Sequence, residues 1–388
     1  MVTLQTADNA LKTFYLDAIS REIDGKASAF LSQIEKTSMN VVGKSVTKVI
    51  KTGVHGGIGA GSETGDLPTG DGGDVIAFHA PLKNLYGTIE ISDKAIRASA
   101  SDEGAFVNLL NEEMQGLVKS AKYNFGRMLF GEGNGKLAQV STGYGSDTLY
   151  VDTVNAIEEG MYIDVYDGGQ KIATKAKVVS VNKMEKRISL GGVNWGSKLP
   201  GETASVYIHG AENGYELTGL GALFSNADIY DTDRSKEYMN PYIYSCPDAF
   251  SLEVLDESID RVEERSGSRV NFMLCSWAVK RIILKCAREN NVQIGTTTIG
   301  DNMHVPTYNG IPIVVDRFCP ENTLYLLNTN DFKICQLCDW QWMEGEDGKI
   351  LKQVPGKPVY TATLVKYAEL ICEKPFGQAA ITDIYEEE

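Results

Sequence analysis

The chain has 388 residues, of which 43% are hydrophobic and 23% charged, and its formal net charge is −15. This length is too great for one simple core and suits two or three structural units, and the ordinary composition excludes disorder of the whole chain. The acidic balance argues against a protein that wraps nucleic acid by counterion release. No apolar run of about 18 residues and no secretory signal is present, so a membrane association is not expected.

The N-terminal residues 1–44 are predicted to form an arm that contains an amphipathic helix. Its apolar side chains recur mostly at steps of three and four residues. A terminal helix with no core of its own is expected to dock on another molecule. Three residues of this helix are therefore candidates for contact between subunits: Leu16, Ile19 and Ile23.

Residues 45–95 are predicted to form an extended β-hairpin loop. Strand-like patterns at 41–52 and 75–92 flank a glycine-dense segment, 53–74, that lacks the apolar side chains needed to fold alone. A lone two-stranded hairpin is marginal in water, so a neighbouring subunit is expected to supply the missing contacts. The candidate contact residues in this loop are Gly56, Gly57, Leu67, Lys83 and Tyr86.

Residues 96–147 contain the clearest predicted helix, which runs from about 101 to 130. Ser101 is a favourable N-cap, and Gly131 and Gly133 are expected to end the helix. One continuous apolar face over about six turns predicts a rod about 40–45 Å long. Glu113, which borders that face, and Arg127 are further candidates for contact between subunits.

The remaining chain divides into three regions. Residues 148–210 show short, evenly spaced strand patterns, which predict an inserted small β-barrel or sandwich. Residues 211–358 read as α/β material, with helices at about 252–266 and 277–289. Residues 359–388 are predicted to hold a final pair of alternating strands that returns to the earlier units.

Candidate chemical sites are few. The four histidines lie at unrelated positions, and no metalloprotease, nucleophile-elbow or phosphate-loop motif occurs. Asp228, Asp231 and Asp233 could bind a cation, but the glycine and distal glutamate of a calcium loop are missing. Glu112 and Glu113 point about 100° apart on the predicted helix, so subunit contact or solvation is expected rather than acid–base work. The sequence thus predicts no catalytic, cofactor or metal site and no enzyme.

The seven cysteines are predicted to be reduced, packed thiols. All lie between Cys246 and Cys372, and their number is odd, unlike a disulfide framework in a short secreted chain. Cys335 and Cys338 have the spacing of a redox or zinc motif, but no second cysteine or histidine pair accompanies them.

The order of these elements resembles the major capsid proteins of tailed bacteriophages, the fold typified by phage Hong Kong ninety-seven and shared by encapsulins. The segments that carry the resemblance are RMLFGEGNGKLAQV at the helix end, ELTGLGALF and IYDTDRSKEYMNPY within 216–242, and YNGIPIVVDRFCPENTLYLLNTNDF at 308–332. The resemblance implies an α+β capsid fold with an N-terminal arm, extended loop, spine helix, axial domain (211–358) and inserted β-domain.

The resemblance also implies a role. It predicts a subunit that assembles with many copies of itself, as pentamers and hexamers, into an icosahedral virion shell around double-stranded DNA, which it meets by non-specific proximity. Assembly in the host cytoplasm with a scaffolding protein or protease, a portal and a decoration protein is implied, with no cofactor.

Three alternatives remain open from the sequence. An encapsulin-like compartment would share the fold, and a hydrolytic enzyme would use 148–210 as an accessory module. The insertion alone could bind a carbohydrate or a host surface.

Overall fold

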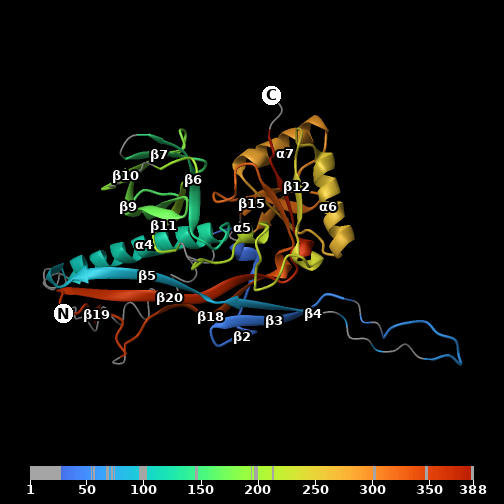
Figure 1. The fold of residues 1–388 in the computed structure, drawn as a ribbon, viewed down its shortest axis with the longest axis horizontal. Helices are drawn as coiled ribbons and strands as arrows, with labels where there is room; N and C mark the ends of the chain where they lie inside the picture. The colour runs from blue at the N-terminus through green and yellow to red at the C-terminus, as the bar shows by residue number, and fades with distance from the viewer. Residues whose placement is uncertain are drawn as a thin grey trace.

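The computed structural model describes residues 28–385 except 54, 56, 67–69, 71–72, 74, 96–102, 145–146, 194, 196–199, 212–213, 300–302 and 346–347. The described part is an α+β structure with four sheets, one of them a closed barrel. A long helix and a long sheet lie side by side at one end, and a seven-stranded domain lies at the other (Figure 1). The predicted fold class is confirmed.

The central sheet is built on β20 (Val359–Cys372). This strand pairs antiparallel with β18 (Phe332–Trp342) and β19 (Lys352–Gln353) along one edge and with β5 (Lys83–Ser92) along the other. β1 (Glu35–Thr37) adds to β18 in parallel. Ten residue pairs join β5 to β20, from Lys83–Ala368 to Ser92–Val359.

The helix α4 (Glu103–Met128) lies along this sheet (Figure 1). Its 26 residues correspond to a rod of about 39 Å. Met114 and Phe125 are buried against the sheet, as the predicted apolar face requires. Gly87 of β5 permits this packing, because a Cβ there would come within 2.7 Å of Leu117 Cδ1.

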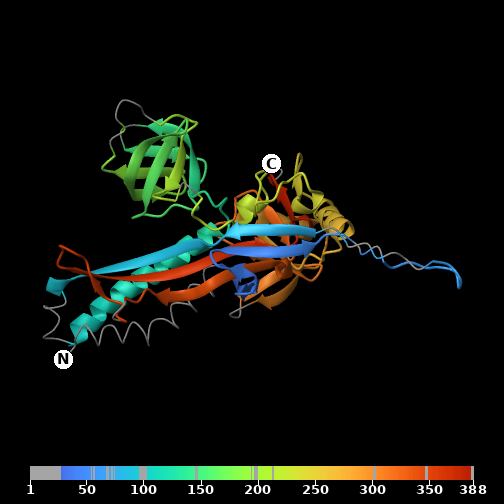
Figure 2. The ribbon, with the colours of Figure 1, turned by 60° about the horizontal axis from the view of Figure 1, so that its bottom comes forward.

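A small sheet of β2 (Val41–Val42), β3 (Ser45–Lys51) and β4 (Val75–Pro81) carries the predicted loop. β3 and β4 pair over seven residues, and the described part of the segment between them, including 57–66, extends away from the body (Figures 1 and 2). The hairpin in the structure is shorter than the predicted one, because only β3 and β4 form it. Residues 83–92 pair with β20 instead, because Leu85, Ile89 and Ile91 are buried beneath α4.

Six strands form the closed barrel, in the order β10-β7-β6-β11-β8-β9. They are β6 (Lys136–Tyr144), β7 (Thr148–Val151), β8 (Tyr162–Asp167), β9 (Gln170–Asn182), β10 (Arg187–Gly191) and β11 (Ser205–Ile208). The barrel has its own apolar core and stands apart from the central sheet (Figure 2). It includes residues 136–144, ahead of the predicted insertion, because closure needs β6 between β7 and β11.

The seven-stranded domain has the strand order β12-β21-β17-β13-β16-β15-β14. Its strands are β12 (Tyr242–Ser245), β13 (Phe272–Cys275), β14 (Gly295–Ile299), β15 (Met303–Tyr308), β16 (Ile311–Val315), β17 (Leu324–Leu327) and β21 (Ala379–Thr382). Helices α6 (Leu252–Ser266) and α7 (Trp277–Glu289) share one core with one face of this sheet. Both begin at a serine N-cap, Ser251 or Ser276, and α6 ends at Gly267 in the left-handed conformation.

The last strand differs from its prediction. The sequence predicts an alternating strand here, and β21 lies between β12 and β17 in the seven-stranded domain, whereas β20 lies in the central sheet. Ala379, Ala380 and Ile381 are all buried, which is the pattern of a strand covered on both faces rather than of an alternating one.

The remaining helical pieces are short. They are α5 (Leu220–Leu223) and the 3-10 turns η2 (Leu31–Gln33), η3 (Glu237–Met239), η4 (Thr329–Asp331) and η5 (Pro375–Gly377). No helix in the described residues is long and apolar enough to cross a bilayer.

Gly219 lets the start of α5 lie directly against the end of α4. A Cβ at this position would approach Met128 O to 2.4 Å and Gly131 O to 2.7 Å, and both are backbone atoms that cannot rotate away. The contact is held by the hydrogen bond from Leu220 N to Leu129 O, 2.8 Å long.

We expect Gly219→Ala to lower the free energy of unfolding by about 1–3 kcal/mol, because the new methyl group would separate α4 from α5. Urea denaturation of the unassembled subunit measures this change. Gly116→Ala is the matched control, since Gly116 is exposed on α4 with nothing within 4 Å of its added Cβ. That variant should be neutral or more stable by up to about 1 kcal/mol. Equal stability of the two variants would contradict the packing argument.

Candidate functional site

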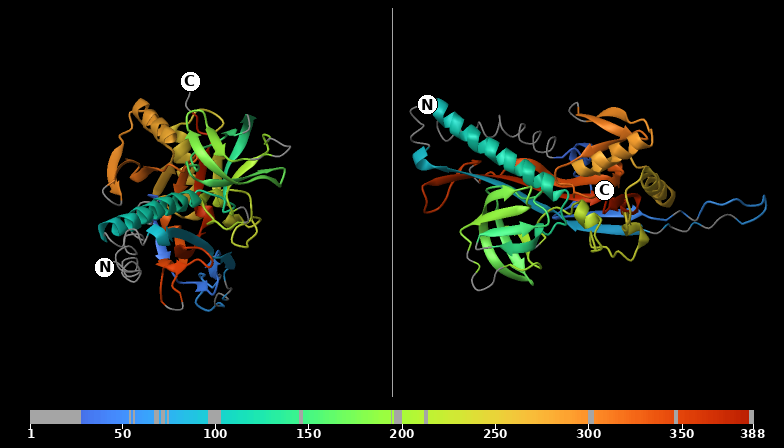
Figure 3. Two further views of the ribbon diagram at one scale, coloured as in Figure 1. Left: turned by 90° about the vertical axis from the view of Figure 1, so that its left-hand side faces the viewer. Right: turned by 90° about the horizontal axis from the view of Figure 1, so that it is seen from above.

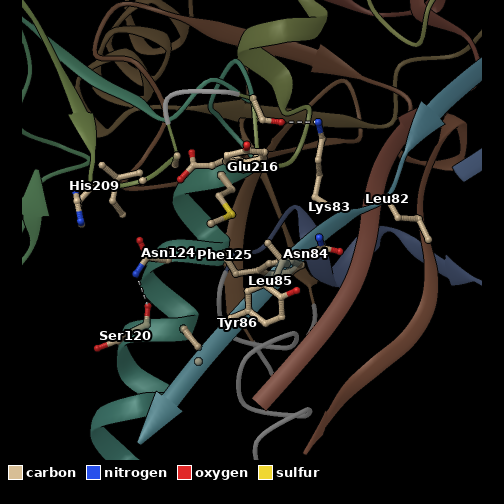
Figure 4. A pocket seen from close by; sticks show the side chains of 18 of the residues that line it. Leu82, Lys83, Asn84, Leu85, Tyr86, Ser120, Asn124, Phe125, His209 and Glu216 are labelled. Carbon is tan, nitrogen blue, oxygen red and sulfur yellow. Dashed lines mark hydrogen bonds between the residues drawn. The ribbon is translucent and has the colours of Figure 1, made fainter. Parts of the chain in front are cut away.

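A groove of about 1000 Å³ lies between α4, β5 and the segment that follows the barrel (Figure 4). Leu85, Phe125, Met128 and Trp340 contribute apolar surface to it. Lys83, Asn124, His209 and Glu216 are among the polar residues that line it. The groove is therefore the place where the spine helix, the base of the extended loop and the barrel linker meet.

Lys83 and Tyr86, both predicted contact residues, lie in this groove on β5. Lys83 Nζ donates to the carbonyl oxygen of Gly214 at 2.7 Å and lies 3.9 Å from Glu369 Oε2 (Figure 4). Its side chain is only 16% exposed, so its charge is used mainly within its own subunit. The ring of Tyr86 packs edge-on against Tyr367, and the residue is 58% exposed and open to a partner.

Glu369 is a fully buried carboxyl group near the C-terminal end of β20. It accepts hydrogen bonds from Thr218 N at 2.8 Å and Leu370 N at 3.0 Å, and Thr218 Oγ1 lies 3.3 Å away. Burial raises the pKa of Glu369 to about 7, even though Lys83 and these donors favour the charged form. The group thus links the central sheet, the loop base and the chain that leads to α5.

A buried ion pair joins the end of α4 to the same linker. Arg127 donates from Nη1 to Glu216 Oε2 at 2.9 Å, and its Nη2 forms a second contact with Oε1. Both side chains are 3% exposed. Arg127, predicted as a subunit contact, therefore lies inside its own subunit. A forked pair of this kind fixes the orientation of the guanidinium as well as its position.

A second buried cation, Lys366, projects from β20. It donates to Asp339 Oδ1 at 2.7 Å and lies over the rings of Phe125 and Trp340, 5.4 and 5.6 Å from their centroids. Burial alone would raise the pKa of Asp339, but the Lys366 charge outweighs it and lowers that pKa to about 2. This pair fastens β18 to β20 beneath the spine.

Polar contacts hold the barrel to the rest of the subunit. Within the barrel, the buried Asp164 of β8 accepts from Lys175 N at 2.7 Å and lies 3.0 Å from Nδ1 of His209, which directly follows β11. On another side, Arg317 bridges to Glu158 at 2.6 Å and Lys186 to Glu321 at 2.9 Å. Exposed bridges of this type contribute little stability, so they orient the barrel more than they anchor it.

The other predicted contact residues divide into two groups. Gly57 is half-buried within the extended loop, and Glu113 is exposed on α4, available to a partner. Five lie outside the described residues: Leu16, Ile19, Ile23, Gly56 and Leu67. The buried network around Glu216, Glu369 and Lys366 was not predicted from the sequence. Charged residues within otherwise apolar strand patterns are the one signal that points to it.

Two sets of residues were the weaker candidates for a chemical site: the aspartates near Arg234 and the cysteines. Arg234 donates to the carbonyl oxygens of Ala227 and Leu223, and its backbone N–H donates to Asp228. All seven cysteines are free thiols. Within the described ranges, no three His, Cys, Asp or Glu side chains lie close enough together to hold a metal ion.

At the level of sequence, no family model and no curated protein matches the chain. At the level of structure it is similar to a chain of the cyanophage A-1(L) capsid asymmetric unit, with a TM-score of 0.53 and 11% identity over 91% of this chain and 90% of that one. The holo-SrpI encapsulin complex from Synechococcus elongatus also matches, with a TM-score of 0.48 and 10% identity over 92% and 88%. The chain has the tailed-phage capsid fold, as its sequence resemblance predicted.

Glu369 should make the stability of the subunit depend on pH. Its pKa is raised from 4.5 to about 7 in the folded chain, so the folded state holds a proton that the unfolded state releases between these values. Stability should therefore fall as pH rises from about 4.5 through 7, by up to about 3 kcal/mol.

Glu369→Gln keeps an acceptor for Thr218 but removes the ionisation, so it should flatten this slope. Urea unfolding of the unassembled subunit at pH 5 and pH 8 measures the difference. Glu112→Gln, an exposed substitution on α4, is the control and should leave the slope as it is. An unchanged slope in Glu369→Gln would show that the buried carboxyl is not responsible.

Proposed function

We propose that this chain is the subunit of a closed protein shell, and more specifically the major capsid protein of a tailed bacteriophage. In this role many copies enclose double-stranded DNA, and the protein is a structural component of the virion rather than an enzyme. The capsid fold supports the coarser statement. The exposed surface of the subunit supports assembly, and the acidic charge of the chain suits enclosed DNA.

The observation that carries the proposal is the exposed face of the β3–β4 hairpin, whose opposite face, with Ile76 and Phe78, is buried in the core. Val49 on β3 and Val75 on β4 are 62% and 55% exposed, and Ile58 in the loop between the strands is 87% exposed. Apolar side chains this exposed along a strand pair suit a contact surface. A neighbouring copy would bury them.

The charge of the chain suits a container for DNA. With a formal net charge of −15, a shell of many copies would repel the packaged DNA and leave it free to leave again. Contact with DNA in this proposal is proximity without sequence readout. A scaffolding protein or protease, a portal and a decoration protein are the further partners that we expect.

We expect the purified chain to form closed icosahedral shells, visible by negative-stain electron microscopy. A variant in which residues 52–74 are replaced by a two-residue turn should remain folded but lose assembly, because the loop can no longer reach a neighbour. Thermal unfolding and size-exclusion chromatography of the variant separate these effects. A compact monomer of the wild-type chain under all conditions would overturn the proposal.

The contents of shells recovered from the native source distinguish the two kinds of container. A phage capsid should hold nuclease-protected double-stranded DNA of uniform length. An encapsulin-like compartment should instead hold a folded cargo protein, and recovery of such a cargo without DNA would replace the finer proposal while keeping the coarser one.

The barrel is proposed to decorate the shell rather than to build it. Its ends are adjacent, because Ile208 N donates to Gly135 O at 2.9 Å and Tyr207 pairs with Lys136. Excision of residues 136–208 with a short glycine linker should therefore leave a folded subunit that still assembles. Loss of shells from this variant, with unfolding behaviour unchanged, would assign the barrel to the architecture.

A further inference from the structure

The outward face of α7 is basic and carries an exposed aromatic ring. Arg281, Lys285 and Arg288 are exposed on this face, and Lys280 is half-buried beside them. Trp277, in the first turn, is 52% exposed. The opposite face of α7 fills the core with Val279, Ile282, Ile283 and Ala287. Tryptophan and arginine are enriched among the residues that dominate binding at protein interfaces, and both are exposed on this face.

One flank of α6 has the opposite charge. Asp256, Asp260 and Glu263 follow one another at steps of four and three and line a pocket of about 500 Å³, with Ile259 and Ile311 as apolar neighbours. Asp256 accepts from Tyr308 Oη at 2.9 Å, whereas Asp260 and Glu263 have no ion-pair partner among the described residues. Arg269 also lines the pocket, so the flank is acidic but not uniformly so.

Within one subunit, the charged faces of α6 and α7 cannot pair with each other. They pack side by side through their apolar faces on the same side of the seven-stranded sheet, where both contribute to one core. Their charged faces point outward, and the described residues give Arg281 and Arg288 no carboxylate partner. Figure 3 shows both helices at the surface of this domain.

We propose that the Trp277–Arg281–Arg288 face of α7 docks on the Asp260–Glu263 flank of α6 in a second copy of the chain. The two surfaces are different parts of one subunit, so the contact is head-to-tail and can close into a ring. This inference rests on the proposed shell function and names the surfaces that join neighbours within a ring. Charge complementarity selects a second copy over DNA, because the chain as a whole is strongly acidic.

Charge exchange tests the proposal directly. Arg281→Glu with Arg288→Glu places like charges across the contact, as does Asp260→Arg with Glu263→Arg. Each pair should slow assembly at low salt, followed by light scattering, by about tenfold or more. The chain that carries all four substitutions restores opposite charges and should recover most of the wild-type rate. Added salt should slow the wild-type chain and the exchanged chain alike.

The controls separate folding from docking. Arg281, Arg288 and Asp260 are exposed and Glu263 is half-buried, so both pairs of substitutions should leave the thermal unfolding temperature close to that of the wild type. Lys183→Glu, on an exposed turn of the barrel, makes one such charge reversal away from both helices and should assemble normally.

The possible results distinguish a failure of the helix pairing from a failure of the proposed shell function. If the wild type forms shells and neither pair of substitutions slows it, the helix pairing is wrong while the shell function stands. If both pairs slow assembly and the four-fold exchange does not recover it, the pairing is also wrong. In that case, DNA binding would be compared by gel shift, and its loss only in the variant with Arg281→Glu and Arg288→Glu would assign the α7 face to DNA. If the wild type forms no shell, the proposed function fails, and sedimentation of ring-sized oligomers decides the pairing.

Discussion

The rest of the structure depends on the pairing of β5 with β20. These strands lie far apart in the sequence, yet their ten residue pairs form the surface on which α4 rests. Without that surface the apolar stripe of α4 would face water, since a single helix cannot bury its own apolar face. The same pairing fixes the direction in which β4 and the extended loop leave the body, because Leu82 alone separates β4 from β5. The position of the loop is thus determined by the core.

Buried charges make this arrangement specific rather than strong. Lys366 and Glu369 both project from β20 and are fully buried, and Arg127 meets Glu216 at the end of α4. Removing such charges from water costs about as much as their pairing returns, so apolar residues of similar size could stabilise these sites equally well. What the pairs add is a penalty for any other register, which would leave a charge buried without a partner. The junction of spine, loop and linker is where that specificity is needed.

Local signals explain which parts of the fold could be predicted. Helices α6 and α7 were predictable because serine caps and an apolar periodicity lie within each segment. The register of residues 83–92 and the place of β21 were not, because they depend on strands elsewhere in the chain. The same holds for Arg127, whose partner is 89 residues away, and for Lys83, whose acceptor is 131 residues away. Periodicity identifies a face but not what covers it.

The kinds of contact available to this subunit suit an assembly that must correct its errors. The core of each unit is apolar and internally complete, whereas the surfaces left for neighbours are an exposed ribbon, exposed rings and charged helix faces. Each such contact is weak alone, since exposed charge pairs contribute at most about 1 kcal/mol. A misplaced copy that makes only one of them would dissociate readily. In a closed shell every copy makes all of them at once, and the multivalent sum retains it. Under the proposed function, weak and dispersed contacts are therefore what would allow a large shell to be both accurate and stable.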